Sequence, residues 1–106
     1  MTSHNELTQE FEEAMHNIYR RALLEAGYKA TVFLDMLFKH GGVETARRLI
    51  HSPRVSTGYT ALWERNRLDL TVEALISENQ KWHPLFSADE LAICRKRLTQ
   101  YGYVSK

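Results

Sequence analysis

The sequence has little cysteine and proline and no long hydrophobic run. Its single cysteine, Cys94, excludes an internal disulfide bond, and no two of its five histidines lie three to five residues apart, so the usual spacing of zinc ligands is missing. The longest apolar run, residues 31–38, is interrupted by Asp35 and is far shorter than the ~20 residues that cross a membrane. The first ten residues lack the basic and apolar regions of a secretory signal. We therefore expect no metal, no cofactor and no membrane partner, and a cytoplasmic location in a bacterial-type or other reducing compartment.

The sequence also lacks an excess of charge of either sign, because 14 Lys and Arg are balanced by 13 Asp and Glu and the formal net charge is +1. Such a balance gives no bulk attraction to nucleic acid or to an acidic partner. The distribution is uneven, however. Residues 1–26 carry five glutamates and two arginines, whereas residues 39–67 carry one lysine, five arginines and two glutamates. Any electrostatic signal therefore lies in the central segment.

The N-terminal third predicts two helices. Ser3 and Glu6 have the spacing of a capping box, and an apolar stripe at helical spacing follows until Gly27, which favours a helix end. The next segment, residues 29–39, is apolar on nearly every face, which predicts a central, buried helix. So apolar a helix in a short chain can also be covered by a second subunit, which makes homodimerisation a hypothesis.

The rest of the chain predicts shorter helices separated by turns. Residues 43–50 give one helix, which ends before Pro53; a second begins at Ser56 with Tyr59, Leu62 and Trp63 facing inward, and Thr71 caps a third. A second capping box, Ser87 with Glu90, begins the last helix, whose apolar stripe places Cys94 in the core as an inert thiol.

These elements predict an all-α protein, a compact single domain over residues 1–106 with five or six helices, one of them long and N-terminal. The predicted core comprises Leu7, Phe11, Ile18, Phe33, Leu37, Leu49, Leu62, Leu75, Leu91 and Leu98.

The three short central helices resemble a helix-turn-helix in outline, and arginines gather between them. If they lined one surface they would contact phosphates or a partner: the candidates are Arg47, Arg48, Arg54, Arg65 and Arg67. The other interpretation is that these arginines solvate outer helix faces. It is favoured by the absence of a turn glycine between Ile50 and Ser56 and by Pro53.

No residue pattern indicates catalysis. Histidines, serines and Cys94 form no recognisable catalytic spacing, and the Gly41-Gly42 pair lacks the lysine and hydroxyl of a phosphate loop. Arg47 and His51 are separated by three residues, whereas helical ribonucleases of the HEPN type place four to six between arginine and histidine. We therefore expect neither an enzyme nor a small-molecule substrate.

The stretch STGYTALWERNRLDLTVEALI, a following tryptophan, LFSADELAICRKRL and YGY together resemble a group of small, uncharacterised bacterial proteins. The resemblance covers residues 41–103 and implies a short helical cytoplasmic protein, carried in some cases on mobile genetic elements. It implies no activity.

Two hypotheses follow for function. The first is a non-enzymatic protein-interaction or regulatory module of the bacterial cytoplasm, which binds another protein or a second copy of itself through its first or second helix. The second is a helix-turn-helix-like nucleic-acid-binding regulator that uses the arginine-bearing segment 43–67.

Overall fold

The computed structural model describes residues 4–104, and all regular secondary structure within that range is helical. The elements in chain order are α1 (His4–Ala26), α2 (Thr31–His40), α3 (Gly42–His51), α4 (Thr57–Glu64), η1 (Leu68–Leu70), α5 (Val72–Ser77), η2 (Gln80–Leu85) and α6 (Ala88–Gln100), where η denotes a 3-10 helix. The all-α prediction with one long N-terminal helix is confirmed. The predicted Ser3 cap lies outside the described residues.

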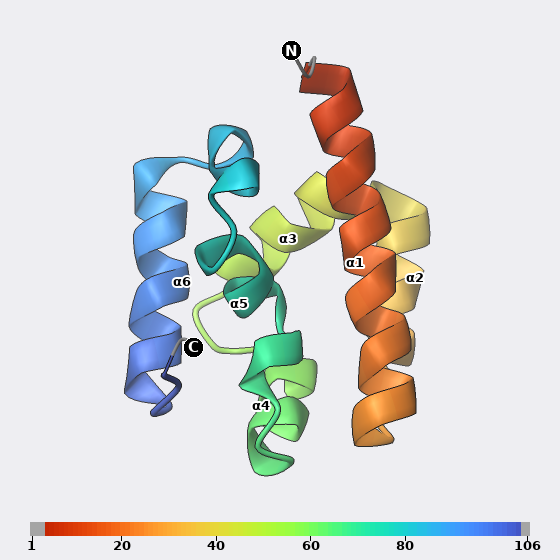
Figure 1. Cartoon of the computed structure of the whole chain (residues 1–106), viewed down its shortest axis with the longest axis vertical. Helices are drawn as coiled ribbons and strands as arrows, with labels where there is room; N and C mark the ends of the chain where they lie inside the picture. The colour runs from red at the N-terminus through yellow and green to blue at the C-terminus, as the bar shows by residue number, and fades with distance from the viewer. Residues whose placement is uncertain (1–3, 105–106) are drawn as a thin grey trace.

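The helices form one compact body. In Figure 1, α1 runs along one side and α6 along the other, with α3 and α5 between them and α4 near the end at which α1 finishes. The Cα radius of gyration is 12.8 Å, close to the ~13 Å of a compact domain of about 100 residues.

The core lies where the predicted stripe of α1 meets the second half of the chain. Phe11 and Met15 are fully buried, and Ile18 and Ala22 are nearly so. The Phe11 ring meets the rings of Trp82 and Phe86 edge-on at centroid distances of 5.4 and 5.3 Å. Such contacts add to the hydrophobic free energy of burial, so they anchor the η2 segment to α1.

All ten predicted core residues pack against the interior, but they differ in how far they are buried. Five of them are buried: Phe11, Ile18, Leu37, Leu62 and Leu98. The other five pack, half-buried, against the largest buried cluster: Leu7, Phe33, Leu49, Leu75 and Leu91. Cys94 is fully buried, and burial raises the pKa of its thiol to about 12.

Helices α1 and α3 cross at very close range because Gly42 has no side chain. A Cβ atom at Gly42 would lie 2.9 Å from the Cα atom of Glu12. The backbone N–H of Gly42, at the start of α3, donates to Glu12 Oε1 at 2.9 Å. A carboxylate at that place satisfies an open amide and complements the positive end of the helix dipole.

The turn signals read from the sequence act at the expected residues. The side chains of Ser56, Thr71 and Ser87 each accept a hydrogen bond from a first-turn amide, and Ser87 completes a capping box with Glu90. Gly27 has a φ of 65°, directly after α1. The starts of α4, α5 and α6 are therefore fixed largely by local chemistry.

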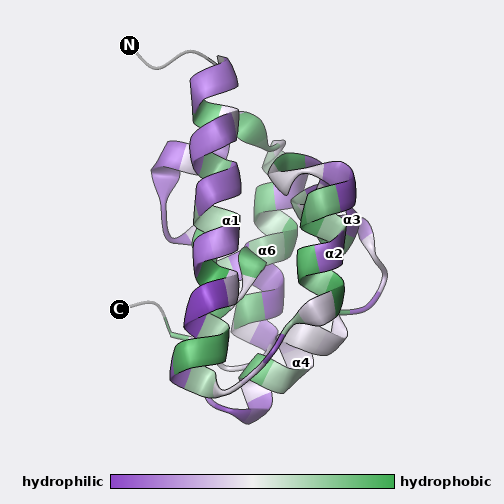
Figure 2. Ribbon diagram, turned by 90° about the vertical axis from the view of Figure 1, so that its right-hand side faces the viewer, coloured by the Kyte–Doolittle hydropathy of each residue, from purple (hydrophilic) through white to green (hydrophobic). Residues whose placement is uncertain are grey.

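Two predictions about orientation are wrong. Helix α2 is not central: it lies on the outside of α1 and α3, and of its residues only Leu37 is buried. Figure 2 shows this mostly hydrophobic helix on the surface that faces the viewer. Trp63, predicted to face inward, is 45% exposed and rests edge-on against Tyr101. In both cases the neighbouring elements cover one side of the helix only.

A buried ion pair joins the last two α-helices to α3. Arg97 Nη1 on α6 lies 3.1 Å from Glu73 Oε2 on α5 and also donates to the carbonyl of Leu49 at 2.9 Å. The second terminal nitrogen of Arg97 donates to the carbonyl of Ser52. Glu73 and Arg97 are 4% and 8% exposed. Burial raises the pKa of Glu73, and the Arg97 guanidinium opposes that rise.

Candidate functional site

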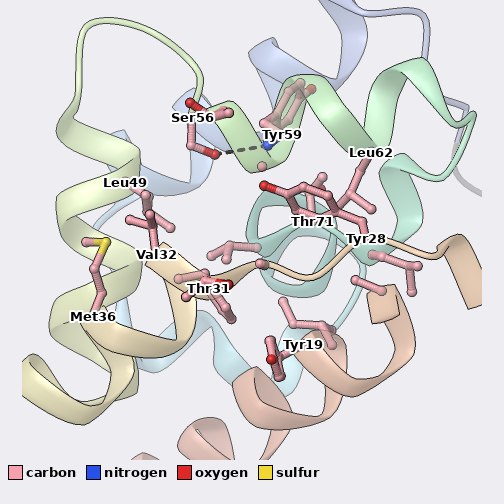
Figure 3. A pocket seen from close by; sticks show the side chains of 18 of the residues that line it. Tyr19, Tyr28, Thr31, Val32, Met36, Leu49, Ser56, Tyr59, Leu62 and Thr71 are labelled. Carbon is pink, nitrogen blue, oxygen red and sulfur yellow. Dashed lines mark hydrogen bonds between the residues drawn. The ribbon is translucent and has the colours of Figure 1, made fainter. Parts of the chain in front are cut away.

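An apolar cavity of about 440 Å³ lies between α1, α2, α4 and α5. Figure 3 shows Val32, Met36 and Leu49 on one side of it, and Ser56, Tyr59 and Leu62 on another. The segment between α1 and α2, with Tyr28, crosses the same space. The wall is therefore built from five separate parts of the chain.

Several residues on the cavity wall are small. Ala22, Ala30 and Gly58 contribute little or no side-chain volume, and all three line it. A Cβ atom added at Gly58 would lie 3.7 Å from the Tyr28 ring, in ordinary contact. Residue 58 therefore lies directly against the Tyr28 ring.

Charged groups on the wall are few. Lys29 lies on the wall, is exposed, and has no carboxylate partner in the described part of the chain. Glu73 also lines the cavity, but its carboxylate is held by Arg97 at 3.1 Å. The first turns of α2 and α4 border the space as well. Ala30, the N-cap residue of α2, supplies no side-chain cap, which leaves amides of the first turn without a side-chain acceptor.

The outer surface of α2 carries large exposed apolar side chains. Val32 and Phe38 are each 75% exposed. Between them lies an ion pair of Asp35 with Lys39, at 2.9 Å. The Phe38 ring meets His16 of α1 edge-on at 5.9 Å and is otherwise open to solvent. We call Thr31, Val32, Asp35, Phe38 and Lys39, all exposed, the outer surface of α2.

The five candidate arginines do not form one group. Arg47 donates to the carbonyl of Leu85 at 2.9 Å, beside η2, whereas Arg65 donates to the carbonyl of Ala26 at 3.1 Å, at the end of α1. These two regions lie at opposite ends of the molecule in Figure 1. Arg67 belongs with Arg65, because it also reaches α1.

Three of these arginines are neutralised by carboxylates. Arg48 pairs with Glu44 at 2.9 Å, and Arg47 lies 3.7 Å from Glu90. Arg67 contacts two carboxylates, Glu25 at 2.7 Å and Asp69 at 3.0 Å. Hydrogen bonds from Arg21 and Arg67 lower the pKa of Glu25 to about 2. The fold thus brings acidic groups from outside residues 39–67 to the positive segment.

The remaining two arginines differ. Arg65 lies over the Tyr28 ring, 5.2 Å from its centroid, and donates to two carbonyls. Arg54 is exposed, and the described part of the chain supplies it with no partner. In addition, α3 packs on α1, α2 and α6, whereas α4 packs on η1. The close pairing of two helices that defines a helix-turn-helix is therefore missing here.

Arg47 and His51 meet at one carboxylate, that of Glu90. His51 Nε2 lies 2.7 Å from Glu90 Oε2, and the other oxygen, Oε1, accepts from the Ser87 amide at 2.8 Å. Burial raises the pKa of Glu90, but the Ser87 amide, His51 and Arg47 outweigh it and lower the pKa. Both carboxylate oxygens of Glu90 are thus used in capping α6 and holding it to α3. The cluster of Arg47, His51 and Glu90 therefore has a structural role.

Within residues 4–104, no cluster of three or more His, Cys, Asp or Glu side chains has the geometry to hold a metal ion, and no helix is long and apolar enough to cross a membrane. Comparisons of the chain with protein-family models, curated proteins and solved structures give no match. The resemblance to small bacterial proteins therefore stays a prediction.

Sequence reasoning missed the cavity entirely. None of the candidate arginines lines it; of the residues that do, Lys29 and Ala30 were predicted to belong to the buried helix of residues 29–39, and Tyr28 was given no role. One signal was present: a helix that begins at Thr31 directly after an alanine has no capping side chain.

Proposed function

We propose that this protein is a non-enzymatic interaction module of a reducing compartment such as the bacterial cytoplasm. It binds a second protein chain through the outer surface of α2. The observation that carries the proposal is the 75% exposure of Val32 and Phe38 on one helix. Full burial of a side chain of this kind contributes about 1.5–3 kcal/mol of hydrophobic free energy. A partner that covers Val32 and Phe38 would gain this free energy on binding.

The composition of the surface fits an interface. An aromatic anchor such as Phe38 is typical of binding hot spots, and the Asp35–Lys39 pair gives a partner a charge pattern to match. A second copy of the chain carries the same surface and is the form of partner to test first. The buried thiol of Cys94, the single cysteine, suits a reducing compartment.

The test is sedimentation equilibrium of the wild type and two variants, followed by affinity capture from the native host with nuclease treatment. Phe38→Ala should weaken self-association, or retention of a captured protein, at least tenfold. The matched control is Leu24→Ala, because Leu24 is 81% exposed but lies on α1. The proposal is overturned if the wild type is monomeric and Phe38→Ala captures every protein that the wild type captures. It is also overturned if Leu24→Ala weakens binding as much as Phe38→Ala does.

The alternative, a nucleic-acid-binding regulator, has weaker support because carboxylates neutralise Arg47, Arg48 and Arg67. Retention on heparin at moderate salt separates the two hypotheses. A salt slope that flattens when Arg47, Arg48 and Arg54 become alanine would favour the alternative.

A further inference from the structure

A cleft of about 440 Å³ lies between α1, α2, α4 and α5 and opens to solvent beside exposed residues such as Lys29 and Thr31. Sites for small molecules span roughly 300–1,000 Å³ and are mostly apolar with a few polar groups. At ~30 Å³ per atom, the share that a water molecule takes in the liquid, the space accommodates about 15 non-hydrogen atoms.

The wall sorts into an apolar part and a polar edge. Aliphatic side chains such as Ile18, Leu49 and Leu62 supply the apolar part. Thr31, the first residue of α2, and Ser56, the N-cap residue of α4, lie on the wall, and the Ser56 hydroxyl accepts from the Tyr59 amide. A ligand with an apolar body and a polar head could therefore bury its body against the aliphatic side chains and hydrogen-bond its head at the polar edge.

The charges on the wall favour an anionic head. Lys29 offers a cation without a carboxylate partner in the described chain, while the one wall carboxylate, Glu73, is already paired with Arg97. The exposed position of Lys29 places its charge toward solvent rather than in the apolar interior.

We propose that this cavity binds a small amphipathic carboxylate, with its apolar body between α1, α2 and α4 and its carboxylate beside Lys29. The inference goes beyond the proposed interaction function, because it assigns a small-molecule ligand to the space between α1, α2 and α4; Thr31 and Val32 belong both to that wall and to the outer surface of α2, whereas Phe38 lies off the wall. Binding is reversible and involves no covalent step.

The test is isothermal titration calorimetry and thermal unfolding with two probes of about 12 non-hydrogen atoms, decanoate and decanol, which match the cavity in size. Decanoate should bind at one site and raise Tm by about 12 °C at a hundredfold excess over Kd. Decanol should bind at least fivefold more weakly. Equal affinity for the two probes would overturn the role of Lys29, and no saturable binding of either would overturn the whole proposal.

Variants locate the site. Lys29→Gln should weaken decanoate about fivefold and leave decanol unchanged, whereas Lys96→Gln, an exposed lysine on α6, should change neither. Ala30→Trp should abolish binding of both probes, because the tryptophan side chain fills the cavity. If that variant does not fold, Thr57→Trp serves instead, because Thr57 lines the cavity and is exposed. Unchanged binding in a folded filling variant would refute the site.

The outcome is separable from that of the proposed function. Phe38→Ala lies outside the cavity wall and should leave decanoate affinity within twofold of the wild type. The filling variants should leave the surface of Phe38 in place, so loss of one activity does not entail loss of the other.

Discussion

Replacement of Arg97 by methionine should destabilise the protein severely. The change leaves the Glu73 carboxylate, 4% exposed, without its counter-charge at 3.1 Å, and it removes donors from the carbonyls of Leu49 and Ser52. Breaking a buried ion pair from one side costs about 3–5 kcal/mol. A domain of this length has a free energy of unfolding of about 5–15 kcal/mol, so the loss is a large fraction of the whole.

The expected fall in Tm follows from the entropy of unfolding. At about 2.1 cal/mol/K per residue, a chain of this length has an unfolding entropy of about 0.22 kcal/mol/K, so Tm should fall by roughly 13–23 °C. Urea unfolding followed by circular dichroism gives the free energy directly. The matched control is the double variant Glu73→Met with Arg97→Met, which removes both charges and should recover most of the loss.

The deficit of Arg97→Met should depend on pH with a defined sign. Burial raises the folded-state pKa of Glu73 above its usual value, and loss of Arg97 raises it further. A group with a raised folded pKa gives stability that is lost as pH rises through that pKa. The deficit of Arg97→Met should therefore be largest at pH 7 and smaller at pH 5, whereas the free energy of unfolding of the double variant, which has no carboxylate at position 73, should have no contribution from this titration. An equal deficit at both pH values, or a double variant as unstable as the single one, would refute the reasoning.

Two further outcomes test the packing. Gly42→Ala should cost about 1–3 kcal/mol in urea unfolding, because its Cβ would lie 2.9 Å from the backbone of Glu12; Gly58→Ala, where the nearest atoms are at 3.7 Å, is the control and should cost less. Cys94 should react with a thiol reagent only as fast as the protein opens, because it is fully buried and burial raises its pKa to about 12. A native reaction rate close to that of the unfolded chain would contradict its placement.

The starts of α4, α5 and α6 were determined by local signals in the sequence. Capping hydroxyls, a proline and positive-φ glycines act within a few residues of themselves, so the starts at Ser56, Thr71 and Ser87 could be predicted without knowledge of the fold. The stripe of α1 was predictable for the same reason, since a helical period is a local property.

Only the tertiary structure decided which groups meet. It placed the apolar helix α2 outside, because α1 and α3 cover one side of it and nothing in the described chain covers the other. It paired Arg67 with Glu25 across 42 positions and Arg97 with Glu73 across 24. It also left open the space between Ala22, Ala30 and Gly58. Burial, charge neutralisation and cavities are sums over residues far apart in the chain, and no local pattern records them.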